Sequence, residues 1–196
     1  MHMAGRDFPL YRPNALGLSG WRPLFEKFAS RAGEIDSGLG SLIQQELGFL
    51  EHAWPTDLPE GVIHADLFPD NVFFIDEKLS GIIDFYFACN DSLAYDIAVC
   101  LNAWCFDPDS EFEPSKGAAL LQGYESVRPL SAKERQSMPT LARGAAMRFL
   151  LTRSYDWLNT PKDALVARKD PADYIRRLAF HQSAASIADY APQLIS

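Results

Sequence analysis

Four polar side chains in the stretch 61–87 are of types that carry chemistry. His64, Asp66 and Asn71 follow the spacing H-x-D-x-x-x-x-N, and Asp84 comes 13 residues after Asn71. Transfer of a γ-phosphoryl group needs an aspartate that orients the attacking hydroxyl and further oxygen ligands that hold a hard cation. We therefore interpret this stretch as a phosphoryl-transfer site.

Each of these residues also has a purely structural interpretation. Taken singly, Asp66 and Asn71 are of the types that commonly form turns or cap helices. The four residues together, at this spacing, are improbable as an accident and favour the site. His64 is expected to hold the loop by hydrogen bonding and packing, and not to bind a metal or carry a proton.

Short strands and turns are expected to position these side chains. A strand opening at 62–63 would put His64 and Asp66 on one side of an extended backbone. The turn-forming residues 67–70 are expected to bring Asn71 back beside Asp66. Two apolar runs then predict a hairpin, with strands at 72–75 and 81–85 around a polar turn at 76–80, and this places Asp84 at the end of a strand.

Helical periodicity dominates the rest of the chain. Before the turn-rich connector 54–61, one helix is expected from Gly20, with Ser19 as its cap and Pro23 in its first turn, and a second is expected after a cap at Asp36 or Ser37. Later helices are predicted by the apolar positions Leu93, Ile97, Leu101, Leu120, Leu121 and Tyr124, the stretch 141–157, and Tyr174 to Ala179. Ser131 and Glu134 form a capping-box pattern. The expected fold class is mainly α with a small β-hairpin (α+β).

Composition sets limits on function. The chain has 196 residues, of which 47% are hydrophobic and 22% charged, as expected for one globular domain. Its net charge of −8 argues against a general nucleic-acid or anionic-membrane surface. The three cysteines lack metal-ligand spacing and are expected to be buried thiols in a reducing cytosol. No signal peptide or long apolar span is evident, so a cytoplasmic location is expected.

The chain resembles a known superfamily at the residues that carry the chemistry. HADLFPDN at 64–71 and GIIDF at 81–85 are similar to the catalytic motif and metal-binding strand of the aminoglycoside phosphotransferase/choline kinase superfamily, which has a protein-kinase-like fold. RDFPLYRPNALG at 6–17, WRPLF from Trp21 and the segment 84–107 resemble the homoserine kinase family within it, which is unrelated to the GHMP kinases. The resemblance implies an ATP- and Mg²⁺-dependent transferase of threonine biosynthesis.

The resemblance also implies a role for each motif residue. Asp66 matches the catalytic aspartate, and Asn71 and Asp84 match the two metal ligands. Asp84 stands where kinases carry D-F-G, although here Tyr86 replaces the glycine. Asp96 matches the helix aspartate that supports the catalytic loop, so it and His64 are expected to have structural roles.

The small-molecule substrate implied by the resemblance is L-homoserine, which has a carboxylate and an ammonium group. Arg148 and Arg153 are candidates for binding the carboxylate, and Asp91 or the surroundings of Asp84 for binding the ammonium. The alternative is that these residues are solvated or salt-bridged surface groups. A choline-type or aminoglycoside-type acceptor is also open.

The motifs of a nucleotide-binding lobe are not found upstream of the catalytic motif. No Gly-rich hairpin and no strand lysine precede it, since Lys27 is the one lysine in residues 1–65. We expect a single kinase-like C-terminal lobe over 1–196, made of a leading segment with helices at 1–60, the catalytic loop and metal hairpin at 61–90, and a helical part at 91–196. A natural truncation, a gene fragment and a mis-assigned start are all open.

Two other functions are alternatives. Without the nucleotide lobe, the chain could be a catalytically silent fragment or a binding remnant with an exposed apolar face. A metal-dependent hydrolase is less consistent with the sequence, because no second carboxylate or histidine cluster provides a two-metal site.

Overall fold

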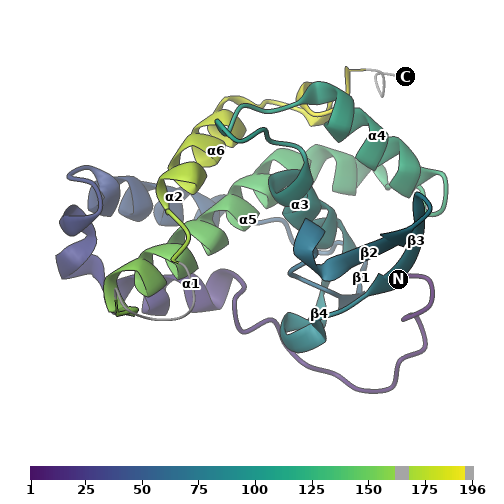
Figure 1. The fold of residues 1–196 in the computed structure, drawn as a ribbon, viewed down its shortest axis with the longest axis horizontal. Helices are drawn as coiled ribbons and strands as arrows, with labels where there is room; N and C mark the ends of the chain where they lie inside the picture. Colours follow the sequence, from purple (N-terminus) through teal and green to yellow (C-terminus); the bar gives the residue numbers. More distant parts are fainter. Residues whose placement is uncertain (162–167, 193–196) are drawn as a thin grey trace.

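The computed structural model is mainly helical, with two small antiparallel sheets (Figure 1). It describes residues 1–161 and 168–192, so part of the predicted helical region 91–196 lies outside the described residues. The helices are α1 (Leu18–Glu26), α2 (Leu39–Ala53), α3 (Leu93–Trp104), α4 (Pro114–Glu125), α5 (Ala132–Asn159) and α6 (Ala172–Ser183), and the strands are β1 (Glu60–Ile63), β2 (Val72–Ile75), β3 (Lys78–Ile82) and β4 (Cys89–Ser92). The expected α+β class is confirmed.

Helix α5 is the centre around which the other helices pack. It runs for 28 residues and begins with the predicted capping box, in which the Ser131 hydroxyl accepts from the Glu134 N–H. It packs against α1, α2, α3 and α6, and its middle third is almost wholly buried. Gly144 allows the closest approach, because a Cβ there would collide with the rings of Trp54 and Trp21. Figure 1 shows α1 and α2 at one end of the molecule and the strands at the other.

The first sheet pairs β1 with β4, a strand that the sequence pattern did not predict. Ile63 lies opposite Cys89 in this antiparallel pair. The segment Cys89–Ser92 contains three polar residues and no apolar alternation, so its extended form depends on pairing with a distant strand. The Asn90 N–H also donates to the Arg12 carbonyl at 2.7 Å, which ties the N-terminal segment to the edge of the sheet.

The second sheet is the predicted hairpin of β2 and β3, with a shorter turn than expected. Asp76 and Glu77 have φ angles of 47° and 62°, the left-handed pair typical of two-residue hairpin turns. The second strand therefore begins at Lys78 and ends at Ile82, not at 81–85. Asp84 consequently lies beyond the strand, with a φ of 60°, and not within its end as expected.

The predicted beginnings of α1 and α2 were wrong in detail. The N-cap of α1 is Gly17, so Ser19 is inside the helix and Pro23 lies beyond its first turn. The N-cap of α2 is Gly38, whose N–H donates to the Asp36 carboxylate. In both helices the N-cap residue is a glycine, which has no side chain to accept from the first turn.

Two further expectations concern the cysteines and the membrane. Cys89, Cys100 and Cys105 are free and buried, as predicted. Burial raises the pKa of the Cys89 thiol to about 11, which keeps that side chain protonated and unreactive at neutral pH. Within the described residues, every helix is too short or too polar to cross a membrane.

Candidate active site

Asp96, in the first turn of α3, holds the loop that follows β1. Its carboxylate accepts hydrogen bonds from the backbone N–H groups of His64 at 3.1 Å and Ala65 at 2.8 Å. Ala65 has a φ of 63°, which residues with a side chain rarely adopt. Because Asp96 is only 3% exposed, these charge-assisted bonds form away from water and stabilise the strained turn just before Asp66.

His64 links the same loop to the end of β3. Its Nε2 donates to the Ile83 carbonyl at 2.9 Å, and its Nδ1 accepts from the Asp66 N–H at 3.3 Å. One ring nitrogen donates and the other accepts, so this network assigns a neutral imidazole. The ring is fully buried, and its position between the two backbone segments brings Asp66 and Asp84 to the same side of the molecule.

Asp66, Asn71 and Asp84 line one open cleft of about 240 Å³. The Asn71 Nδ2 donates to the Asp66 backbone carbonyl at 2.8 Å, so the amide oxygen of Asn71 is left for another partner. A 3-10 turn at Pro69–Asn71 makes this return of the chain possible. The other residues that line the cleft are Phe68, Asp70, Phe149, Arg153 and Lys169.

Arg148 of α5 lies behind Asp66. Its guanidinium donates to the Ala65 carbonyl, and its Nη2 is 3.6 Å from the Asp66 carboxylate. Burial raises the pKa of Asp66, and the positive charge of Arg148 opposes that shift. Arg148 is only 2% exposed and does not line the cleft. Besides the loop, its guanidinium lies 4.5 Å from the Phe149 ring centroid and 5.3 Å from that of Phe87.

The other two predicted substrate-binding residues lie in different places. Arg153 lines the cleft from α5, one turn after Phe149. Asp91 does not line it, and its carboxylate accepts from the Asn14 side chain at 2.7 Å and from the Ser92 N–H at 2.6 Å. The structure thus brings together Asp66, Asn71, Asp84 and Arg153, and separates Asp91 from them.

Sequence reasoning missed several residues that line the cleft. Phe68 and Phe149 have the character of core residues, and Lys169 lies about a hundred residues after the motif. Asp70 is within the motif and could have been considered from its position alone. The two rings meet edge to face at 4.9 Å between centroids, a contact between segments far apart in sequence.

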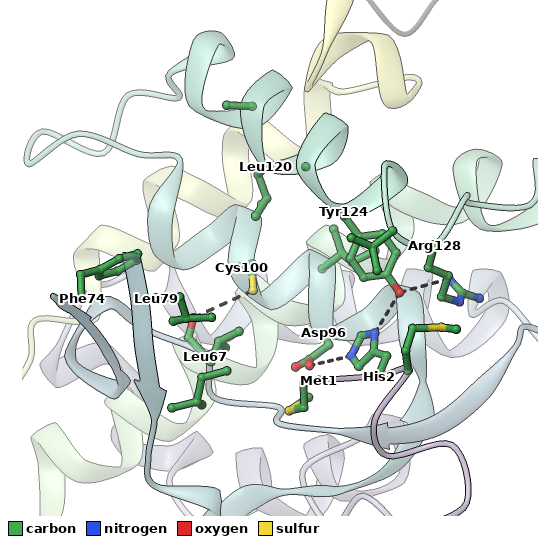
Figure 2. A pocket seen from close by; sticks show the side chains of 16 residues that line it. Met1, His2, Leu67, Phe74, Leu79, Asp96, Cys100, Leu120, Tyr124 and Arg128 are labelled. Atoms are coloured by element: carbon green, nitrogen blue, oxygen red, sulfur yellow. Dashed lines mark hydrogen bonds and ion pairs between the residues drawn. The ribbon is translucent and has the colours of Figure 1, made fainter. Parts of the chain in front are cut away.

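A larger cavity of about 660 Å³ lies on the other side of Asp96 (Figure 2). His2 bridges Asp96 and Tyr124 there, with its ring nitrogens 3.0 Å from the carboxylate and 2.8 Å from the hydroxyl. The remaining lining is largely apolar and includes Met1, Leu67, Phe74, Leu79 and Leu120. His2 is therefore a third support for Asp96 that the sequence did not reveal.

Metal-ligating groups in the cleft are few. Among the described residues, no group of three or more His, Cys, Asp or Glu side chains could hold a metal ion. The Asn71 amide oxygen and the exposed Asp84 carboxylate are oxygen donors of the type that Mg²⁺ prefers. These two donors suit a cation that completes its coordination shell with water and phosphate oxygens, as Mg²⁺ does in phosphoryl transfer.

Solved structures define the class of fold. An aminoglycoside-3'-phosphotransferase of type VIII superposes with a TM-score of 0.52 at 21% identity, over 77% of this chain and 54% of that one. The ethanolamine kinase of Plasmodium vivax gives 0.61 at 16% identity, over 90% and 51%. At these identities the likeness concerns the fold alone, which is kinase-like as expected.

The family follows from the sequence. A family model described as "Phosphotransferase enzyme family" matches residues 1–130, so the chain belongs to that family. Relatives named homoserine kinase are 60% identical in Rhizobium meliloti (strain 1021) and 63% identical in Rhodopseudomonas palustris (strain BisA53), each over 190 residues. These alignments cover 97% of this chain but 58% of each relative, so the chain spans little more than half of their length.

Proposed function

We propose that this chain is the catalytic and acceptor-binding part of an ATP:L-homoserine phosphotransferase of threonine biosynthesis. The observation that carries the proposal is the convergence of Asp66, Asn71 and Asp84 on one cleft. The substrate assignment is supported by relatives of about 60% identity that are named homoserine kinase. A small molecule is therefore the proposed partner, with no nucleic acid or membrane, and the proposed location is cytoplasmic.

Asp66 is proposed as the residue that accepts or orients the proton of the acceptor hydroxyl. The carboxylate must be ionised for this role, and burial raises its pKa. Arg148 lies 3.6 Å away and favours the anion. We propose that Arg148 acts on Asp66 in this way, as an alternative to binding the substrate carboxylate directly.

Asn71 and Asp84 are the proposed holders of Mg²⁺. A bound Mg²⁺ would neutralise charge on the phosphates of ATP during transfer. The residues of this chain contribute the fixed positions of these oxygen donors, through the bond from Asn71 to the Asp66 carbonyl and the bond from His64 to Ile83. His64 and Asp96 are proposed to have supporting roles only.

The nucleotide is proposed to need a second lobe. The chain spans about 58% of its relatives' length, which is consistent with a C-terminal lobe that works with further residues. For the ammonium group of homoserine, the carboxylates of Asp70 and Asp84 line the cleft, whereas Asp91 is engaged with Asn14. We therefore favour the surroundings of Asp84 over Asp91 for that contact.

A second candidate function is a catalytically silent binding remnant. The observation that favours it is the exposed apolar surface of β2 and β3, which includes Phe74 at 56% and Ile75 at 66% exposure. An exposed apolar face of this kind is typical of a surface that contacts another domain or protein, whether or not the chain is catalytically active alone.

The test is phosphate transfer to three acceptors. ³¹P NMR would follow ATP with homoserine, choline or an aminoglycoside, using this chain and a fusion that adds the unmatched part of the Rhizobium meliloti relative. We expect the fusion to phosphorylate homoserine, and Asp66→Asn to reduce kcat by about 10²–10⁴-fold. Turnover of choline or the aminoglycoside instead would refute the substrate, and absence of transfer to all three would favour the silent remnant.

A further inference from the structure

The cleft has two sides of opposite charge. Asp66, Asp70 and Asp84 line it from the loop and the hairpin, whereas Arg153 and Lys169 line it from α5 and the segment before α6. An acceptor that carries both an ammonium and a carboxylate has the same polarity. The basic side is therefore the one suited to a carboxylate.

Arg153 is held in place by its Nη1 and its guanidinium face, while its Nε and Nη2 edge has no partner among residues 1–161 and 168–192. Its Nη1 donates to the Asp170 carbonyl at 3.3 Å and to the Asp173 carboxylate at 3.4 Å, and its guanidinium lies 4.5 Å from the Tyr174 ring centroid. Among the described residues, no hydrogen bond leaves its Nε or Nη2. These two N–H groups form the fork that grips a carboxylate with two parallel bonds.

The same edge binds carboxylates elsewhere in this protein. Arg22, Arg31 and Arg143 each direct Nε and Nη2 at the two oxygens of one glutamate, at distances of 2.6–3.1 Å. Arg153 differs in that its fork has no such partner within the described part of the chain, although the residue lines the cleft. A ligand carboxylate would complete the pattern.

Lys169 supplies the second positive charge of the basic side. Its Nζ lies 5.7 Å from the Phe68 ring centroid, and it forms no ion pair with a described residue. Phe68 packs on Phe149, which in turn packs on Tyr174 at 5.3 Å. The two cations thus lie over the ends of one row of aromatic rings. Arg153 also pairs with Asp173 through Nη1, whereas Lys169 has no ion pair with a described residue.

We propose that Arg153 and Lys169 form the subsite that binds the carboxylate of the acceptor, and that they select an amino acid over an amino alcohol that lacks this group. The inference rests on the proposed function and assigns the selectivity of its cleft. It makes Arg153 the bidentate contact and Lys169 a charge-only contact. Arg148, which is buried beneath the loop, is left out of this subsite.

The test compares two ligands that differ only in the carboxylate. Isothermal titration calorimetry would measure L-homoserine and 3-aminopropan-1-ol, with L-serine and inorganic phosphate as further probes. The proteins would be the wild-type chain, Arg153→Gln, Arg153→Lys and Lys169→Gln. We expect the wild type to prefer homoserine, and Arg153→Gln to weaken homoserine binding by about 10–100-fold with aminopropanol unchanged. The homoserine affinity of Arg153→Lys should fall between those of the wild type and Arg153→Gln, because lysine keeps the charge and loses the two parallel N–H groups. Lys169→Gln should weaken homoserine binding by about 3–10-fold.

Arg176→Gln is the matched control. Arg176 pairs with the same Asp173 at 2.8 Å but does not line the cleft, so its loss should leave homoserine affinity unchanged.

Equal losses of affinity for homoserine and aminopropanol, or the same loss of homoserine affinity in Arg176→Gln, would overturn the subsite. Weaker binding of inorganic phosphate in the variants with homoserine unaffected would also overturn it. If the wild type binds L-serine but not homoserine, and Arg153→Gln weakens serine, the subsite stands and the homoserine assignment fails. No binding of either amino acid would overturn both.

Discussion

The sheets β1–β4 and β2–β3 are similar in size and pairing, yet they meet solvent differently. Ile63 of β1 is 0% exposed and lies under α3, whereas Ile75 of β2 is 66% exposed. Asp66 follows the buried sheet and Asp84 follows the exposed hairpin. The proposed catalytic side of the cleft is therefore built on the core, and the proposed metal side on a hairpin that the core does not cover.

This difference divides the site between a part that the core holds and a part that the core does not cover. Asp96 fixes the loop that carries Asp66, because its buried carboxylate accepts from the His64 and Ala65 N–H groups. The strand β4 pairs with β1, which ends directly before that loop. The hairpin is joined to that loop by the bond from His64 to the Ile83 carbonyl. A face of exposed Phe and Ile side chains is typical of a surface that contacts another domain or protein.

The largest expected effect on stability comes from truncating an isoleucine in β1, and the same truncation in β2 is the comparison. Ile63→Ala should lower the free energy of unfolding by about 2–5 kcal/mol, because it opens a cavity in the core. Ile75→Ala should change it by less than about 0.5 kcal/mol, since that side chain is mostly exposed. Urea unfolding followed by circular dichroism measures both. Equal losses in the two variants would show that the hairpin is as well packed as β1–β4.

A smaller loss of stability is expected from the side chain that holds the loop carrying Asp66. Asp96→Asn replaces one charged acceptor by an N–H₂ group, and should lower the free energy of unfolding by about 1.5–3 kcal/mol. Hydrogen exchange should speed up at the amides of His64 and Ala65 and remain unchanged in β2 and β3.

Asp57→Asn provides the control for that change. Its side chain is 85% exposed and pairs with Lys133 at 3.4 Å, so the variant should be nearly neutral. Faster exchange throughout β2 and β3 in Asp96→Asn would mean that the two sheets are one cooperative unit, contrary to the division described above.

Much of the loop could be predicted from the sequence because its chemistry is local. The turn at 67–70 and the hairpin were recognisable from residue type, and Asp96 was identified by resemblance to a family. The kinase-like fold and the homoserine kinase relatives are confirmed by the comparisons. The roles assigned to Asp66, Asn71 and Asp84 stay predictions.

What could not be predicted depends on contacts between distant segments. The strand β4 forms only because β1 lies beside it, and Lys169 reaches the cleft through the packing of α5 and α6. The short turn needs two left-handed residues, and although Asp76 is of a type that favours this conformation, Glu77 is not. Sequence reasoning therefore found the loop and missed the opposite wall of the cleft.

The central claim is that Asn71 and Asp84 hold a divalent cation beside Asp66, and Mn²⁺ in place of Mg²⁺ tests it most directly. With ATP present, substoichiometric Mn²⁺ should first broaden the NMR signals of the Asn71 side-chain amide and of the backbone at 83–85. Asp84→Asn should weaken this effect about tenfold or more. The acidic turn at 107–111 is the internal comparison. Broadening there first, or broadening at Asn71 that persists unchanged in Asp84→Asn, would contradict the account.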